Sequence, residues 1–234
     1  MDRIKSMIYT FARKLQKLLA SETILVLGDS HAEVFNSSYF IKAFPFKYFQ
    51  VVSVGGATAS GLENPRSKTQ AYKIFIDAVN KKNYHKIIVM LGEVDTGFVI
   101  WYRASKYDQP VDEMYKKTID TYSKFIKQLS YHAPIIVIST PLPTIDDKSV
   151  GEVAHARKEV KASQKDRTEL TLKFNQEIEI FCKKNKINHI NLDELSLGSD
   201  GLVKPTLKNK DNKDHHYDIS AYSRLIIPEL KKVI

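Results

Sequence analysis

The order of apolar and polar positions along the chain predicts strands that alternate with helices. Five short apolar runs have the character of buried strands, at 23–28, 48–54, 85–91, 134–139 and 187–191. Between and after them, apolar residues recur at helical spacing over 67–80, 111–129, 168–184 and 219–232. Alternating strands and helices indicate right-handed crossovers and a covered parallel sheet. We therefore expect an α/β fold with a central parallel sheet of about five strands.

Residues 1–20 predict a separate amphipathic helix, followed by a single α/β domain over residues 21–234. Its apolar residues are spaced three and four apart and separated by basic residues, so the segment lacks the continuous apolar core of a signal peptide. They are Ile4, Ile8, Phe11, Leu15, Leu18 and Leu19. Two interpretations stay open: an interfacial helix in peripheral contact with an anionic membrane, or a helix docked on its own domain.

Composition, net charge and cysteine content limit which kinds of protein and binding partner are expected. With 234 residues, 43% hydrophobic and 27% charged, the chain is long and apolar enough for a globular core. The net charge of +9 invites an anionic partner, but the lysines are scattered and no nucleic-acid motif is present, so we expect no nucleic-acid binding. The lone Cys182 cannot form an intramolecular disulfide, and a cytoplasmic location is expected. No motif indicates a metal, nucleotide or redox cofactor, or predicts an oligomeric state.

The loops that follow the predicted strands carry the candidate chemistry. Ser30 follows the first strand, where a turn into a helix would present its hydroxyl beside outward-facing backbone N–H groups. The alternative role for this serine is a helix cap. His216, in the last loop, is a candidate base, and Asp211 and Asp214 are the acidic residues available to orient it.

These residues resemble the ordered motifs of the SGNH (GDSL-like) hydrolase superfamily. The matching stretches are Gly28-Asp29-Ser30-His31, Gly56 within 54–58, and the run from His216 to Tyr222. The resemblance implies a flavodoxin-like three-layer α/β/α fold and ester hydrolysis. It also implies that Ser30 is the nucleophile, that His216 is the base, and that the N–H groups of Ser30 and Gly56 bind the oxyanion.

Two positions depart from the motifs of this superfamily. Val94 stands where an asparagine side chain normally completes the oxyanion hole, and loss of such a donor costs about 10²–10³ in rate. Lys213 stands where an aspartate three residues before the histidine normally orients it. Asp214 or Asp211 must then take that role. If His215 were the base instead, Asn212 would occupy the same relative position.

A polar cluster follows the third predicted strand. Glu93, Asp95 and Arg103 either form part of a substrate-binding surface at the mouth of the site, or an Asp95–Arg103 pair braces the loop. Trp101 suits stacking on a sugar ring or filling a groove. The segment 92–103 resembles a branch of the superfamily associated with bacterial surface polysaccharides.

The leading functional hypothesis is a serine esterase that removes O-acyl or O-acetyl groups from a carbohydrate, so that its partner is a small-molecule or glycan ester. A sugar O-acetyltransferase is a close variant, because only the acyl acceptor differs. The altered motifs also allow a catalytically impaired protein that binds a glycan or a protein partner in polysaccharide biosynthesis.

Overall fold

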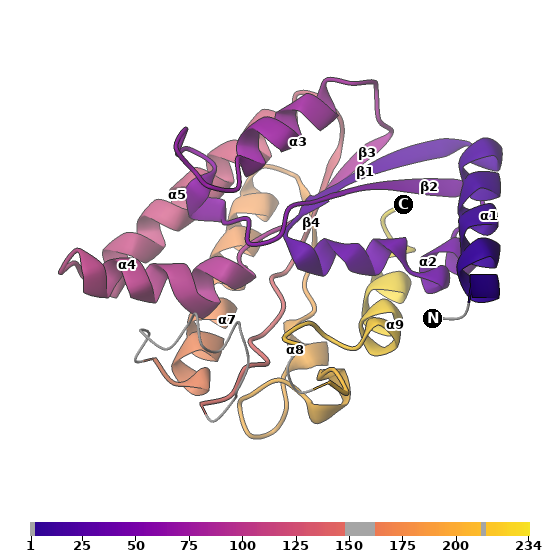
Figure 1. The fold of residues 1–234 in the computed structure, drawn as a ribbon. Coiled ribbons are helices and arrows are strands. Elements are labelled where there is room, and N and C mark those ends of the chain that lie inside the picture. Colours follow the sequence, from indigo (N-terminus) through magenta and orange to yellow (C-terminus); the bar gives the residue numbers. More distant parts are fainter. Residues whose placement is uncertain (1–2, 148–161, 212–213) are drawn as a thin grey trace.

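A five-stranded parallel sheet forms the centre of the protein (Figure 1). The computed structural model describes residues 3–147, 162–211 and 214–234. The strands are β1 (Glu22–Gly28), β2 (Lys47–Ser53), β3 (Lys86–Met90), β4 (Ile135–Ile138) and β5 (Asn188–Ile190), in the spatial order β2-β1-β3-β4-β5. All four neighbouring pairs are parallel. The predicted sheet is confirmed, and its order is that of flavodoxin-like folds.

The apolar runs of the sequence are explained by burial of the sheet on both faces. In β1, Leu25 and Leu27 belong to one hydrophobic core, whereas Ile24 and Val26 belong to the other. All four side chains are fully buried. Because successive side chains of a strand point to opposite faces, a strand covered on both sides needs apolar residues at every position.

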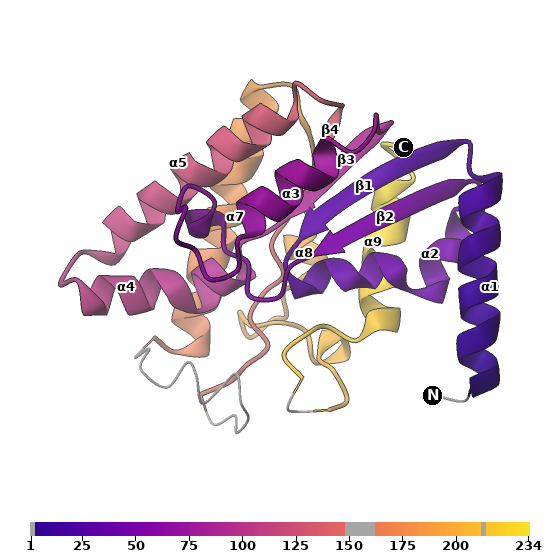
Figure 2. The ribbon, with the colours of Figure 1, turned by 45° about the horizontal axis from the view of Figure 1, so that its top comes forward.

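Helices cover the two faces and give the protein three layers (Figure 2). Helices α3 (Ala71–Val79), α4 (Ile100–Lys106), α5 (Val111–Leu129) and α7 (Gln164–Lys184) contribute to one core. Helices α2 (Ser38–Ala43) and α9 (Ile219–Leu230) contribute to the other, and α8 (Asp193–Ser196) follows β5. This arrangement confirms the predicted three-layer α/β/α architecture.

The ends of the helices differ from the sequence prediction for local reasons. Helix α3 begins four residues later than expected, because Gln70 has a positive φ of 50° and interrupts the helical backbone. Helix α7 begins four residues earlier, at a capping box formed by Ser163 and Asp166. Within the polar stretch 145–166, which precedes and enters this helix, residues 148–161 lie outside the described residues.

No range was predicted for the short helices α2, α4 and α8, or for two other helical segments, although a turn into a helix was expected after Ser30. A 3₁₀ helix, Ser30–Asn36, follows β1, and a π-helical turn, Asp95–Val99, runs directly into α4. Both interrupt the regular 3.6-residue spacing by which an amphipathic α-helix is recognised.

The helix expected at the N-terminus is present as α1 (Arg3–Leu19). It packs against α2 and β2 at the edge of the sheet (Figures 1 and 2). Among the described helices, none is both long and apolar enough to cross a lipid bilayer.

Candidate active site

Ser30 lies at the carboxyl end of β1, where the strand gives way to the 3₁₀ helix Ser30–Asn36. The carboxylate of Asp29 caps this helix by accepting a hydrogen bond from the backbone N–H of His31 at 2.9 Å. Gly28 is required at the end of the strand, because a Cβ atom there would lie 2.5 Å from the carbonyl oxygen of Met90. The close approach of β1 to β3 therefore fixes where the Ser30 loop begins.

The last loop reaches Ser30 because it is tied to the loop after β4. The Tyr217 hydroxyl accepts a hydrogen bond from the backbone N–H of Leu142 at 2.8 Å. The Thr144 hydroxyl donates to the carbonyl oxygen of His215 at 2.5 Å. These bonds hold the segment before α9 at the carboxyl edge of the sheet, where the crevice of an open α/β sheet lies.

Ser30 and His216, 186 positions apart in the sequence, are in hydrogen-bond contact. The Ser30 Oγ lies 2.7 Å from the His216 Nε2. The opposite ring nitrogen, Nδ1, lies 2.6 Å from Oδ1 of Asp214. A hydroxyl, an imidazole and a carboxylate thus form a continuous chain of hydrogen bonds, which is the arrangement of a nucleophile, its base and the group that orients the base.

Asp214 is held in place by three hydrogen bonds besides its own backbone contacts. Its Oδ1 atom accepts from both the imidazole and the backbone N–H of His216, the latter at 2.9 Å. Its Oδ2 atom accepts from the side-chain amide of Asn209 at 2.8 Å. Burial raises the pKa of Asp214, but the hydrogen bonds and charge of His216 outweigh burial, so the pKa lies below its usual value. The carboxylate therefore stays ionised at neutral pH.

Of the two acidic candidates for orienting the base, Asp214 is the residue that bonds to the imidazole of His216. Asp211 is exposed, and its backbone takes part in the turn that leads to Asp214. Lys213, whose position the motif normally gives to aspartate, lies outside the described residues.

Gly56 lies in a solvent-exposed turn beside the Ser30 loop. The turn is closed by a hydrogen bond from the N–H of Ala57 to the carbonyl of Val54 at 3.0 Å, and Gly56 adopts a positive φ of 70° in it. Glycine is favoured at such a position. Apart from its chain neighbours, no atom of the described residues lies within 4 Å of where a Cβ of Gly56 would stand, so a ligand has space to approach its backbone. The turn is joined to β1 by the bond from Val54 N–H to the Gly28 carbonyl at 3.0 Å.

Asp95 braces the segment that follows this turn. Its fully buried carboxylate accepts hydrogen bonds from the N–H groups of Ala59, at 2.6 Å, and Ser60, at 3.0 Å. Burial raises the pKa of Asp95 to about 6, against the bonds from Ser60 and Ala59 and the charge of Arg103, which lower it. These contacts go to the segment after the Gly56 turn, whereas the pair predicted from the sequence joined Asp95 to Arg103, whose charge lowers the pKa of Asp95.

The other residues predicted around the third strand are spread over different environments. Glu93 is buried, and Arg103 is half-buried. Val94 is half-buried at the entry to the π-helical turn. Trp101 packs against the core and donates a hydrogen bond from its indole N–H to the Thr96 carbonyl at 2.7 Å. Its N–H group is therefore engaged by the protein itself.

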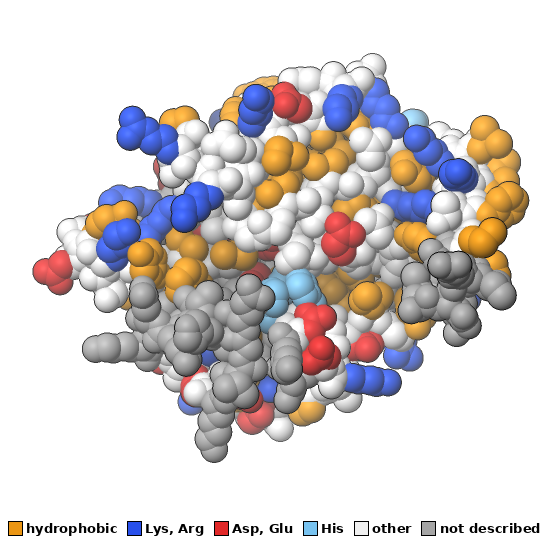
Figure 3. Space-filling view, viewed as in Figure 1, with side chains coloured by type: hydrophobic (Ala, Val, Ile, Leu, Met, Phe, Trp, Pro, Cys, Tyr) orange, Lys and Arg blue, Asp and Glu red, His pale blue; other side chains and the backbone are white. Residues whose placement is uncertain are grey.

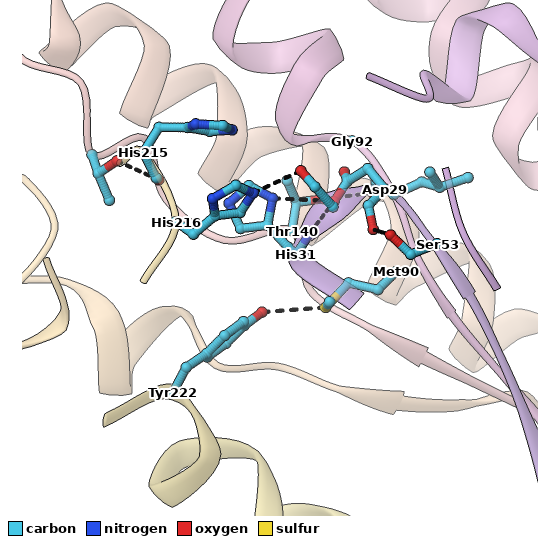
Figure 4. A network of polar contacts seen from close by, with 12 residues as sticks. Asp29, His31, Ser53, Met90, Gly92, Thr140, His215, His216 and Tyr222 are labelled. Carbon is cyan, nitrogen blue, oxygen red and sulfur yellow. Dashed lines mark hydrogen bonds and ion pairs between the residues drawn. The ribbon is translucent and has the colours of Figure 1, made fainter. Parts of the chain in front are cut away.

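His31 forms a second carboxylate–imidazole pair beside the first. Its Nδ1 lies 3.1 Å from Oδ1 of the buried Asp29, and its ring centroid lies 4.7 Å from that of His216 (Figure 4). His31, His215 and His216 form a cluster. Each offers a ring nitrogen, and these nitrogens lie within 4.8 Å of one another, an arrangement that could hold a metal ion. The Nε2 of His216 would then have to exchange its contact with Ser30 for the metal.

Sequence reasoning did not identify Asn209 or the Asp29–His31 pair as parts of this site. Asn209 belongs to a long polar loop whose course cannot be deduced from periodicity. For the pair, the repeated Asp-x-His spacing of Asp29–His31 and Asp214–His216 was a usable signal, since both aspartates bond their histidine in the same way.

Histidine side chains reach the surface at the centre of the face shown in Figure 3, beside acidic side chains. A groove of about 770 Å³ lies between α3, α5 and the residues from 61 to 70. Ser30, Asp214 and His216 are not among its lining residues. The candidate catalytic residues therefore lie outside that groove.

No protein-family model and no curated protein matches the chain. Solved structures do match it. A GDSL-like lipase from Bacteroides thetaiotaomicron is 15% identical, with a TM-score of 0.54 over 97% of this chain and 98% of that one. An extracellular lipase from Streptomyces rimosus is 12% identical, with a TM-score of 0.58 over 92% and 100%. An acetyl xylan esterase is 15% identical, with a TM-score of 0.56 over 91% and 100%.

These likenesses extend over nearly the whole of each chain, whereas the identities are too low to carry more than the fold. The sheet order and the three layers agree with them. The protein therefore has the fold of the SGNH (GDSL-like) hydrolases, at low sequence identity to them.

Proposed function

We propose that the protein is a serine esterase of the SGNH type, in which Ser30 is the nucleophile, His216 the base and Asp214 the residue that orients the base. The observation that carries this proposal is the unbroken chain of hydrogen bonds among the three side chains, at 2.7 and 2.6 Å. Ser30 and His216 are both half-buried, so they are shielded on one side and open to a substrate on the other.

The reaction follows from this geometry. The His216 Nε2 takes the proton of the Ser30 hydroxyl as Oγ attacks the ester carbonyl carbon, which gives a tetrahedral oxyanion. The oxyanion collapses, His216 returns the proton to the leaving alcohol, and the acyl group remains on Ser30. Water, deprotonated by His216, then releases the acid and frees Ser30. Throughout, ionised Asp214 stabilises the imidazolium and holds its Nδ1–H in place.

Backbone N–H groups supply the proposed oxyanion hole. The backbone N–H of Ser30, the first residue of its helix, is one proposed donor, whereas the next two N–H groups, of His31 and Ala32, bond to Asp29. The turn at Gly56 lies beside the Ser30 loop and offers a second N–H. Asp95 supports this arrangement indirectly, because it fixes the segment just after that turn. With Val94 at the position of the usual asparagine, we expect a slower enzyme than one with the complete set of donors.

For the substrate we propose O-acyl, and in particular O-acetyl, groups of a carbohydrate. The support is that a protein of the same fold is an acetyl xylan esterase, together with the open, polar surface around Ser30. Transfer of the acyl group to a sugar hydroxyl is the same mechanism with a different acceptor in the second step. Replacement of the usual asparagine by Val94 favours, as the competing function, a binding protein that has kept the cleft and lost catalysis.

Hydrolysis of p-nitrophenyl acetate by the purified protein tests the proposal. We expect turnover that Ser30→Ala reduces to the background rate. Ser21→Ala is the matched control, because Ser21 stands before β1 at the opposite end of the strand, and it should retain the full rate. Equal rates for the wild type and Ser30→Ala would contradict the proposal. Acetate release from acetylated glycans, with and without added sugar acceptors, then separates hydrolase from transferase.

A further inference from the structure

Helix α1 presents a continuous set of large apolar side chains to solvent. They occupy the right-hand edge of the face shown in Figure 3, where α1 lies in Figure 1. Those described are Met7, Ile8, Phe11, Leu15, Leu18 and Leu19, with exposed fractions of 72, 63, 68, 43, 81 and 53%. At about 100° per residue they share one side of the helix. Single exposed apolar residues are ordinary, but a contiguous set marks an interaction surface.

The opposite side of α1 is docked on the protein through polar side chains. Gln16 is 3% exposed, and its side-chain amide donates to the carbonyls of Phe44 and Lys47, each at 2.9 Å. Arg13 donates to the side-chain oxygen of Asn36 at 2.7 Å and to the carbonyl of Phe49 at 2.5 Å. These contacts fix the rotation of the helix, so its apolar side faces away from the core.

Charge indicates what this apolar side meets. Lys14 and Lys17 are exposed on α1, and the ammonium of Lys17 lies 5.8 Å from the centre of the Tyr48 ring, between the docked side and solvent. Residues 1–20 carry five basic side chains against one acidic one, in a chain of net charge +9. A second copy of the chain on this face would bring like charges together, whereas an anionic lipid surface complements them.

We propose that α1 is an interfacial helix whose apolar side inserts between the headgroups and acyl chains of an anionic membrane, with Lys14 and Lys17 near the lipid phosphates. This interaction surface is independent of ester hydrolysis. The docking residue Asn36 ends the 3₁₀ helix that begins at Ser30, so this short helix connects the docked side of α1 to the candidate active site. At about 2 Å per residue, that helix spans roughly 12 Å.

Co-sedimentation of the full chain with lipid vesicles tests this proposal. We expect binding to vesicles that contain phosphatidylglycerol, weaker binding to pure phosphatidylcholine, and loss of binding at high salt. The double variant Phe11→Ser with Leu18→Ser should bind at least tenfold more weakly. Lys14→Glu with Lys17→Glu should lose the preference for the anionic vesicles. Ile180→Ser, at a 56% exposed isoleucine of α7, is the matched control and should bind as the wild type does.

A second readout shows whether this face of the helix itself enters the lipid. Phe11→Trp should shift its emission to shorter wavelength on addition of anionic vesicles, whereas the wild type, whose one tryptophan is Trp101, should not. Absence of vesicle binding by the folded wild type would overturn the proposal. So would reversible dimerisation in the ultracentrifuge that Phe11→Ser with Leu18→Ser abolishes, because the face would then bind a second copy.

Discussion

Asp214 holds His216 through two hydrogen bonds to a single carboxylate oxygen, one from the backbone N–H at 2.9 Å and one from the imidazole Nδ1 at 2.6 Å. The two residues are only two positions apart, one fewer than the superfamily motif implies. In the proposed mechanism this local contact lets Asp214 orient His216, although Lys213 stands where the superfamily motif has aspartate. The same pair of bonds joins Asp29 to His31, which shows that the Asp-x-His spacing suffices for this contact.

Asp214→Asn should lower the esterase kcat/KM by about 10⁴, because an amide favours the wrong imidazole tautomer and cannot stabilise the imidazolium. The measurement is the steady-state rate on p-nitrophenyl acetate. Asp211→Asn removes an acidic side chain from the same loop and serves as its control, with a rate within about twofold of the wild type. Equal losses in both variants would show that the charge of the loop matters and not the contact with His216.

Val94→Asn should raise kcat. If the side chain at this position faces the oxyanion, as the motif implies, an amide adds a donor worth about 10²–10³ in rate. Val99→Asn, at another half-buried valine of the same helical segment, should bring no gain. A folded Val94→Asn variant that is no faster than the wild type would mean that this position does not contribute to the oxyanion hole.

Gly92→Ala should destabilise the protein by at least about 2 kcal/mol. Gly92 has a φ of 127°, and a Cβ there would lie 2.5 Å from the Thr140 Oγ1 and 2.7 Å from the Phe174 ring. Denaturant unfolding followed by circular dichroism measures the loss. Gly55→Ala is the control, because no atom would contact its Cβ and its stability should change little. Similar stability of both variants would refute the close approach of Gly92 to Thr140 and Phe174.

Asp193→Asn should stabilise the protein at high pH and not at low pH. Burial raises the pKa of Asp193 to about 6, against the hydrogen bond from Asn175, which lowers it. A raised carboxyl pKa means that the native state disfavours the charge. The wild type is therefore penalised above pH 6, by up to about 3 kcal/mol, and the penalty disappears as pH falls from about 6 to 4.

The amide oxygen of this variant can still accept the bond from Asn175, so the comparison isolates the charge. Urea unfolding at several pH values measures the difference between the two proteins. A difference in free energy of unfolding that stays constant between pH 4 and pH 8 would contradict a raised pKa at Asp193.

The strands, and with them the place of Ser30 in the fold, could be predicted for one physical reason. Strands buried on both faces need unbroken apolar runs, and the ends of such runs place Ser30 at the carboxyl edge of the sheet. The choice between Asp211 and Asp214 was not predictable, because it depends on how the polar loop from 199 to 214 turns. Asn209, which bonds to Asp214, belongs to the same loop.

Amphipathic spacing predicted α1 but not which side of it docks. An apolar stripe usually faces the core, yet here Arg13 and Gln16 bond to backbone carbonyls of the protein and turn the stripe outward. The role of Asp95 also depended on tertiary structure, because its partners are backbone N–H groups of Ala59 and Ser60 in a distant loop. Contacts of this kind leave no spacing in the sequence.

Covalent labelling by a fluorophosphonate tests the central claim most directly, because the probe reacts only with a serine whose hydroxyl is activated. We predict a single adduct on the wild-type protein, located at Ser30 by peptide mass spectrometry. Ser30→Ala should abolish the adduct, and His216→Gln should slow its formation by at least about 10³. A folded wild-type protein that forms no adduct, or forms it equally fast without the His216 imidazole, would contradict the account.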